Sequence, residues 1–169
     1  MQPILLNSCA RAATAAEARY RIDAAIAPSR RTRVVALDQG AEPVVRRVAG
    51  RPWAGARFFT WASAAPAPRD NGQLGDLVLR ATDGTESRLS DELVGADVAV
   101  MVATADEAAG VAHAIGDACT LRGIMTAGLV LADGHDAQAA VAALRPHARV
   151  LLLTHDEADV VEVLTALRA

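Results

Sequence analysis

Short runs of β-branched and aliphatic residues alternate along the chain with segments whose apolar residues recur at helical spacing. The runs at residues 98–103 and 150–154 are almost wholly apolar, without the alternation of a half-exposed strand, so we expect both of their faces to be covered. This pattern predicts an α/β fold with a three-layer, doubly wound, mainly parallel Rossmann-like sheet. Its six strands are expected at residues 33–38, 56–61, 77–81, 98–103, 124–132 and 150–154.

Helical segments are predicted between these strands. We expect the hydroxyl of Ser87 or Ser90 to open the short helix at 89–94, and Asp83-Gly84 favours a tight turn before it. The helices are expected at residues 42–48, 89–94, 105–121, 137–144 and 157–167.

Two further segments complete a single predicted domain over residues 1–169. The alanine-rich stretch at 7–27, with Arg and Glu interspersed, predicts an extra N-terminal helix that ends before Pro28. The stretch at 62–75 contains two prolines and two glycines, so we expect a flexible loop there. With 169 residues and 52% apolar content, the chain is long enough to bury one sizeable core.

The composition excludes several functional classes. All basic residues are arginine, so there is no lysine for a Schiff base or for a Walker phosphate loop. The net charge of −3 argues against nucleic-acid binding, and no apolar run approaches the roughly 18 residues of a membrane span. Two cysteines, Cys9 and Cys119, are too few for a disulfide framework. We therefore expect a cytoplasmic protein, and the alanine bias is typical of a GC-rich bacterial genome.

The charge is unevenly distributed. Residues 1–57 carry ten arginines and four acidic residues, whereas residues 58–169 carry seven and sixteen. The basic segment either folds back on the acidic remainder or reaches an acidic partner or a phosphate.

In a doubly wound sheet, ligands bind at the carboxyl ends of the strands, in the crevice where the strand order reverses. With the common order 3-2-1-4-5-6, this crevice lies between the first and fourth strands. A nucleotide there would place Asp38 on a ribose hydroxyl and the loop at Thr104 on a phosphate. The candidate cofactor-binding residues are Asp38, Gln39, Gly40, Thr104, Ala105, Asp106 and Gly110.

The first of these loops lacks the dinucleotide fingerprint G-x-G-x-x-G. The chain there reads LDQGAEP at 37–43, with Gly40 as its one glycine. The carboxylates of Asp38 and Glu42 disfavour a pyrophosphate at the helix start. We expect them to stabilise that helix through its free amides, with a Mg²⁺-nucleotide as the alternative.

Three passages share the character of one known superfamily: Gly-Ala-Asp at 95–97 before a buried strand, the strand at 123–130, and the strand at 150–154 before an acidic helix start. From about residue 33 onward the chain thus resembles the nucleotide-binding domain of the tubulin and FtsZ superfamily. The resemblance implies a purine-nucleotide site at the loop after residue 103. The family's G-G-G-T-G-T-G loop is replaced here by TADEAAG at 104–110, which keeps only Gly110 and gains two acids. The resemblance therefore implies a shortened, degenerate relative without GTPase activity.

The sequence gives only weak indications of a metal site or of a catalytic nucleophile. A metal site would need His135-Asp136 to converge with His155 and Asp159, and we expect solvated histidines and no metal instead. Asp156 or Thr154 is the expected cap of the last helix. Cys119 falls on a helix with apolar neighbours at helical spacing and is expected in the core rather than as a nucleophile.

Four of the five aromatic residues lie between residues 53 and 61. In a strand, Phe59 and Trp61 face one side and Phe58 the other. The aromatics either fill the core or anchor an interface, for which Trp53, Phe58 and Trp61 are the candidates.

These observations favour a non-catalytic domain that acts through protein–protein contacts, as a homo-oligomer or an accessory subunit. It would have a vestigial nucleotide crevice and no cofactor. The alternative is a nucleotide- or dinucleotide-binding protein, or a small enzyme, with a purine nucleotide at the ends of the first and fourth strands.

Overall fold

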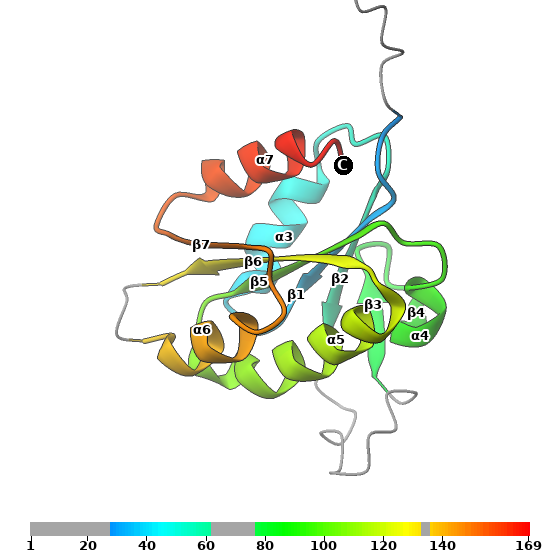
Figure 1. The fold of residues 1–169 in the computed structure, drawn as a ribbon. Helices are drawn as coiled ribbons and strands as arrows, with labels where there is room; N and C mark the ends of the chain where they lie inside the picture. The colour runs from blue at the N-terminus through cyan, green and yellow to red at the C-terminus, as the bar shows by residue number, and fades with distance from the viewer. Residues whose placement is uncertain (1–27, 62–76, 133–135) are drawn as a thin grey trace, which may run out of the picture.

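The computed structural model describes residues 28–61, 77–132 and 136–169. The expected N-terminal helix at 7–27 and the expected loop at 62–75 lie outside these ranges. Within them the chain is an α/β protein with a seven-stranded, mostly parallel sheet and five α-helices (Figure 1). None of the helices in this part of the chain is both long enough and apolar enough to cross a bilayer.

The secondary-structure elements follow the predicted alternation closely. The strands are β1 (Thr32–Ala36), β2 (Ala56–Trp61), β3 (Val78–Ala81), β4 (Glu86–Arg88), β5 (Val98–Ala103), β6 (Met125–Leu131) and β7 (Val150–Thr154). The helices are α3 (Ala41–Ala49), α4 (Leu89–Glu92), α5 (Ala109–Arg122), α6 (Gln138–Leu144) and α7 (Glu157–Ala166), with a 3-10 turn, η2 (Asp106–Ala108), before α5.

The prediction of six strands is wrong by one, because the short strand β4 was missed. Its three residues, Glu-Ser-Arg, carry no apolar pattern that would indicate a strand. The strand forms because the predicted turn at Asp83-Gly84 returns the chain alongside β3, with Gly84 at φ 89°. The predicted opening of α4 by a serine hydroxyl is also wrong, since Arg88 precedes the helix and no side chain caps it.

The sheet has the order β4-β3-β2-β1-β5-β6-β7. The six predicted strands therefore take the expected order 3-2-1-4-5-6, with β4 added outside β3. Strands β2, β1, β5, β6 and β7 are parallel, and β3 runs antiparallel to both β2 and β4. The order reverses between β1 and β5, which places the predicted crevice at their carboxyl ends.

The buried residues form two hydrophobic clusters, and the strands contribute alternate side chains to each. Val98, Val100 and Val102 of β5 pack with residues of α3 and α7, whereas Met101 packs with residues of α5 and α6. Figure 1 shows α3 and α7 on one side of the sheet and α5 and α6 on the other. Every residue of β5 is buried, as its continuous apolar sequence predicts.

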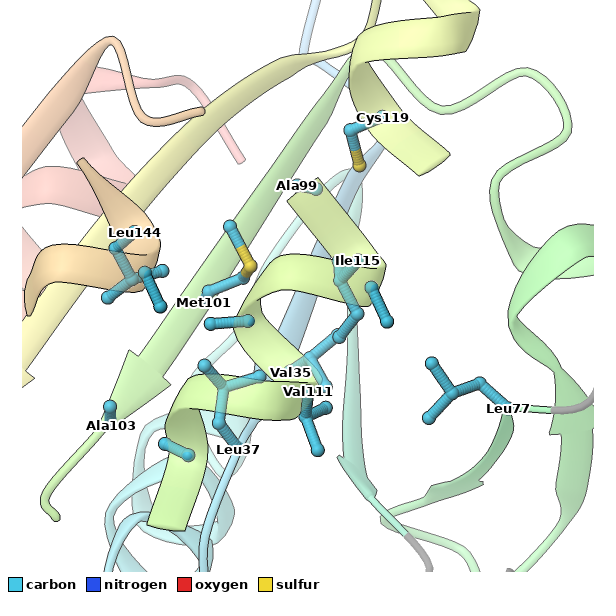
Figure 2. Packing of buried hydrophobic residues seen from close by; sticks show 14 of the residues in the cluster. Val35, Leu37, Leu77, Ala99, Met101, Ala103, Val111, Ile115, Cys119 and Leu144 are labelled. Carbon is cyan, nitrogen blue, oxygen red and sulfur yellow. The ribbon is translucent and has the colours of Figure 1, made fainter. Parts of the chain in front are cut away.

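Helix α5 covers much of one face of the sheet. Figure 2 shows Val111, Ile115 and Cys119 of α5 over Val35 and the neighbouring strand residues. The prediction that Cys119 belongs to the core is confirmed, because its side chain is fully buried. The predicted two-sided burial of β7 is wrong, since Val150 is 44% and Leu153 49% exposed.

Candidate functional site

The side chain of Asp38 lies at the carboxyl ends of β1 and β5, where the strand order predicts the crevice. This residue follows β1 and is 8% exposed. Its Oδ1 accepts hydrogen bonds from the Ala41 amide at 2.8 Å and from the Thr104 hydroxyl at 2.6 Å. Its Oδ2 accepts from the amides of Thr104 at 2.6 Å and Ala105 at 3.1 Å. The carboxylate therefore bonds donors on both sides of the crevice.

The amides that Asp38 engages are of the kind that bind phosphate in nucleotide-binding folds. The Ala41 amide lies in the first turn of α3, and the Thr104 and Ala105 amides follow β5. Such free amides at a helix start and in the loop after a neighbouring strand form an anion site. Here the Asp38 carboxylate is the anion that these amides bind. The chain has no lysine, and the first loop has no second glycine, that would help it bind an anion from outside the protein. The expected helix-stabilising role of Asp38 is confirmed at Ala41.

Gly40 brings the two loops into direct contact. A Cβ atom built on Gly40 would lie only 2.1 Å from Oγ1 of Thr104. The backbone of Gly40 has φ −69°, so the requirement is for space and not for an unusual backbone conformation. Within the described residues, the loops after β1 and β5 therefore leave no gap at this point for a ligand.

The other three predicted cofactor residues take no part in this contact through their side chains. Gln39 and Gly110 are exposed, and a Cβ on Gly110 would meet nothing within 4 Å. Oδ1 of Asp106 accepts hydrogen bonds from the amides of Ala139 at 2.7 Å and Ala140 at 3.4 Å, so this carboxylate stabilises the start of α6. The structure brings together Asp38, Gly40, Thr104 and Ala105, and not the remaining three.

Glu42 also has an internal partner. Its Oε1 lies 2.6 Å from Nη2 of Arg46, one turn further along α3. This is a partly exposed i,i+4 pair of the kind that adds modestly to helix stability. Both acids of the first loop thus bond groups of the protein itself.

The three candidate interface aromatics do not form one surface. The rings of Trp53 and Phe58 lie 6.2 Å apart, and both residues belong to the cluster beneath α3 and α7. Trp61 packs against the opposite cluster, beneath α5. The predicted division of Phe58 from Phe59 and Trp61 between the two faces is confirmed.

Trp53 and Phe58 line an open hollow beside the end of α3. The hollow has a volume of about 280 Å³, and its lining also includes Arg51, Arg57 and the turn at Asp83. The indole nitrogen of Trp53 donates to the Val48 carbonyl at 2.9 Å, so this ring is fixed against its own helix. These aromatics therefore act at least in part as core filling.

An ion cluster around a buried glutamate was not expected from the sequence. Glu92 of α4 is 6% exposed and lies 2.6 Å from Nη1 of Arg57 and 3.3 Å from Nε of Arg33. Burial lowers the pKa of Arg33, as do the charges of Arg57 and Arg31, while Glu92 opposes this. The cluster holds α4 against β1 and β2. The one feature of the sequence that indicates it is an arginine near the start of each of these two strands.

The histidines differ in part from the expectation of solvated side chains. The His147 ring is 9% exposed and packs on Gly116 of α5, with its Nε2 atom 3.8 Å from Asp117. Its ring centroid lies 5.8 Å from that of His113. The solvated assignment of His147 is wrong, because Gly116 leaves space for the ring.

Two acidic residues near the start of α7, Asp156 and Asp159, bond groups of the protein itself. Asp156 caps α7 through the Ala158 amide at 2.8 Å, as predicted. Asp159 accepts a hydrogen bond from the hydroxyl of Thr154. His135 lies outside the described residues, and within them no group of three or more His, Cys, Asp or Glu side chains is placed to hold a metal ion.

No protein-family model matches the sequence, and no curated protein is detectably similar to it. The resemblance to the tubulin and FtsZ superfamily stays a prediction.

Proposed function

We propose that this chain is a non-catalytic, Rossmann-like domain that acts through protein contacts, and that its nucleotide crevice is filled by its own carboxylate. One observation carries the proposal: Asp38 accepts four hydrogen bonds from Ala41, Thr104 and Ala105, and three of the donors are backbone amides of the kind that bind phosphate in nucleotide-binding folds. With these donors already satisfied by the protein itself, we propose a role in protein contacts in place of ligand binding at this position.

The chemistry of the crevice opposes a nucleotide. An incoming phosphate would have to displace the Asp38 carboxylate from donors that it already saturates. Charge-assisted hydrogen bonds of this kind are shorter and stronger than neutral ones, so their loss is costly. The displaced carboxylate would then stand beside a second negative group.

A thermal-shift assay tests this proposal on the full chain. GTP, ATP, NAD and NADP are each added at millimolar concentration, and we expect no rise in melting temperature. A ligand at about 100 times its Kd would add about 2.7 kcal/mol of stability. For a domain of this size that corresponds to a rise of about 5–10 °C. Such a rise with any nucleotide would overturn the proposal and favour the alternative of a nucleotide-binding protein.

An Asp38→Ala variant provides the matched arm of the same experiment. Removing the carboxylate releases the amides of Ala41, Thr104 and Ala105, so we expect inorganic phosphate to stabilise this variant and not the wild type. Gln39→Ala, which changes the neighbouring exposed side chain, is the control and should respond as the wild type does. An equal phosphate response in all three proteins would show that Asp38 does not occupy an anion site.

A further inference from the structure

Strand β7 lies at one end of the sheet and has β6 as its one neighbour in the described part of the chain (Figure 1). Its residues Val-Leu-Leu-Leu-Thr include no charge, glycine or proline. Two of its apolar side chains, Val150 and Leu153, are 44% and 49% exposed. Natural sheet edges are usually protected by charges, prolines, bulges or a covering element, because an unprotected edge pairs with other strands.

The opposite end of the sheet differs in this respect. Strand β4 has three residues, Glu86, Ser87 and Arg88, two of them charged and exposed. Short length and charge are the usual devices that keep an edge from pairing. Of the two ends of the described sheet, β7 is therefore the one suited to accept another strand.

The backbone N–H and C=O groups of β7 that point away from β6 belong to alternate residues of the strand. The amide of Arg149 donates to the Thr126 carbonyl at 2.9 Å, and it therefore faces β6. Because successive residues of a strand direct their backbone groups to opposite sides, the backbone N–H and C=O groups of Leu151 and Leu153 also face β6. The N–H and C=O groups of Val150, Leu152 and Thr154 point away from β6, along the open edge.

We infer that β7 pairs with β7 of a second copy of this chain, antiparallel, around a twofold axis at Leu152, so that the two sheets become one. This inference rests on the proposed function and names the partner. A closed dimer requires the same patch on both copies, and two identical strands meet this condition only when they run antiparallel. With Leu152 opposite Leu152, Val150 stands opposite Thr154. Each of these pairs then exchanges two backbone hydrogen bonds.

The charges beside β7 favour this register. Arg149 precedes the strand and Asp156 follows it. The Asp156 carboxylate accepts the Ala158 amide, and within the described residues neither Arg149 nor Asp156 has a partner of opposite charge closer than 4 Å. In the antiparallel register, Arg149 of each copy lies opposite His155 of the other and one position from its Asp156. Because consecutive side chains of a strand leave opposite faces of the sheet, the two charges attract each other across the end of the seam and do not form a direct ion pair. The two ends of the strand are thus complementary to each other in charge.

Sedimentation velocity of the full chain over a range of concentrations tests this pairing, and we expect a reversible dimer. Leu153→Arg places an unpaired charge within the seam, so the dimer Kd should rise by about tenfold or more. Leu121→Arg is the matched control, because Leu121 is 76% exposed on α5 and lies outside β7. It should leave the dimer Kd unchanged.

A second variant tests the backbone pairing itself. Val150→Pro removes an outward N–H at the first residue of the strand, where proline is tolerated and no β6 bond is lost. The variant should keep its far-ultraviolet circular dichroism and lose affinity for the second copy. The amide of Leu152 should exchange with solvent more slowly in the dimer than in the Leu153→Arg variant.

Three outcomes would overturn the inference. They are a monomer at every concentration, a dimer that both Leu153→Arg and Val150→Pro leave intact, and a monomer in which the Leu152 amide is already protected. None of them bears on the nucleotide assay, so the proposed function would stand with another partner. Conversely, nucleotide binding by an intact β7 dimer would overturn the proposed function alone.

Discussion

Oδ1 of Asp38 lies 2.6 Å from Oγ1 of Thr104, and this hydrogen bond joins the ends of β1 and β5 across the crevice of the sheet. The two residues are 66 positions apart in the sequence. In nucleotide-binding folds of this kind, the ligand lies outside these two strand ends. Here the protein supplies both the acceptor and the donors, so this edge of the sheet does not depend on a ligand for its polar contacts.

Replacing Asp38 should therefore destabilise the protein. Asp38→Ala leaves the amides of Ala41, Thr104 and Ala105 without their acceptor, and we expect a loss of about 3 kcal/mol in the free energy of unfolding. Asp38→Asn keeps one acceptor oxygen and should lose about half as much. Urea denaturation measures both changes. Gln39→Ala, at an exposed position, is the control, and a loss equal to that of Asp38→Ala would contradict the assignment.

Gly40→Ala should be destabilising because the new methyl group would meet the Thr104 hydroxyl. Overpacking of this kind costs about 1–3 kcal/mol. In a Thr104→Ala background the clashing Oγ1 atom is gone, so the same substitution should cost less there. Urea denaturation of the four proteins gives the coupling between the two positions. Strictly additive changes in the free energy of unfolding would show that Gly40 and Thr104 are not in contact.

Much of the fold was predictable because buried parallel strands have a distinctive sequence. Val98–Ala103 is apolar at every position, and such a run is typical of a strand covered on both faces. The location of the crevice follows from the strand order, which the structure confirms. The same rule failed for Val150–Thr154. An apolar run shows that a strand avoids water, and it does not show whether helices of the same chain cover both of its faces.

The site was only partly predictable. A cap on α3 was expected from Asp38 because acceptors at a helix start bond its free amides locally. The bonds from Asp38 to Thr104 and Ala105 depend on the distance between two loops in the folded chain. Likewise, nothing near Glu92 in the sequence indicates that Arg33 and Arg57 surround it. Contacts between residues distant in the sequence are set by the tertiary fold, and no local pattern records them.

Glu92→Gln should destabilise the protein by about 3 kcal/mol, because removing the buried carboxylate leaves the largely buried guanidinium of Arg33 uncompensated. Arg33 is affected most, since burial already lowers its pKa and Glu92 opposes that effect. Denaturation by urea gives the change in stability. Asp91→Asn is the matched control on the same helix, because Asp91 is exposed. A loss for Asp91→Asn as large as that for Glu92→Gln would contradict the role of the cluster.

Two glycines of α5 should respond to alanine in opposite directions. At Gly116 a Cβ would lie 2.3 Å from the His147 ring, so Gly116→Ala should displace that ring and cost about 1–3 kcal/mol. At Gly110 the space is open, so Gly110→Ala should stabilise the helix by about 0.5–1 kcal/mol. Melting temperatures of the two variants check the signs. Stabilisation by both would show that His147 does not occupy the space at Gly116.

The thiol of Cys119 should make stability fall at alkaline pH. Burial raises its pKa from the ordinary value of 9.0 to about 12. Between these values the unfolded thiol is ionised and the native thiol keeps its proton, so the stabilising effect is complete below about pH 9 and is lost up to about pH 12. In a Cys9→Ser background, urea denaturation at several pH values should give a steeper alkaline decline for Cys119 than for Cys119→Ala. The difference should approach about 1.4 kcal/mol per pH unit within that window. Equal slopes, or rapid reaction of the native thiol with a disulfide reagent near pH 9, would show that Cys119 is not sealed in the core beneath α5.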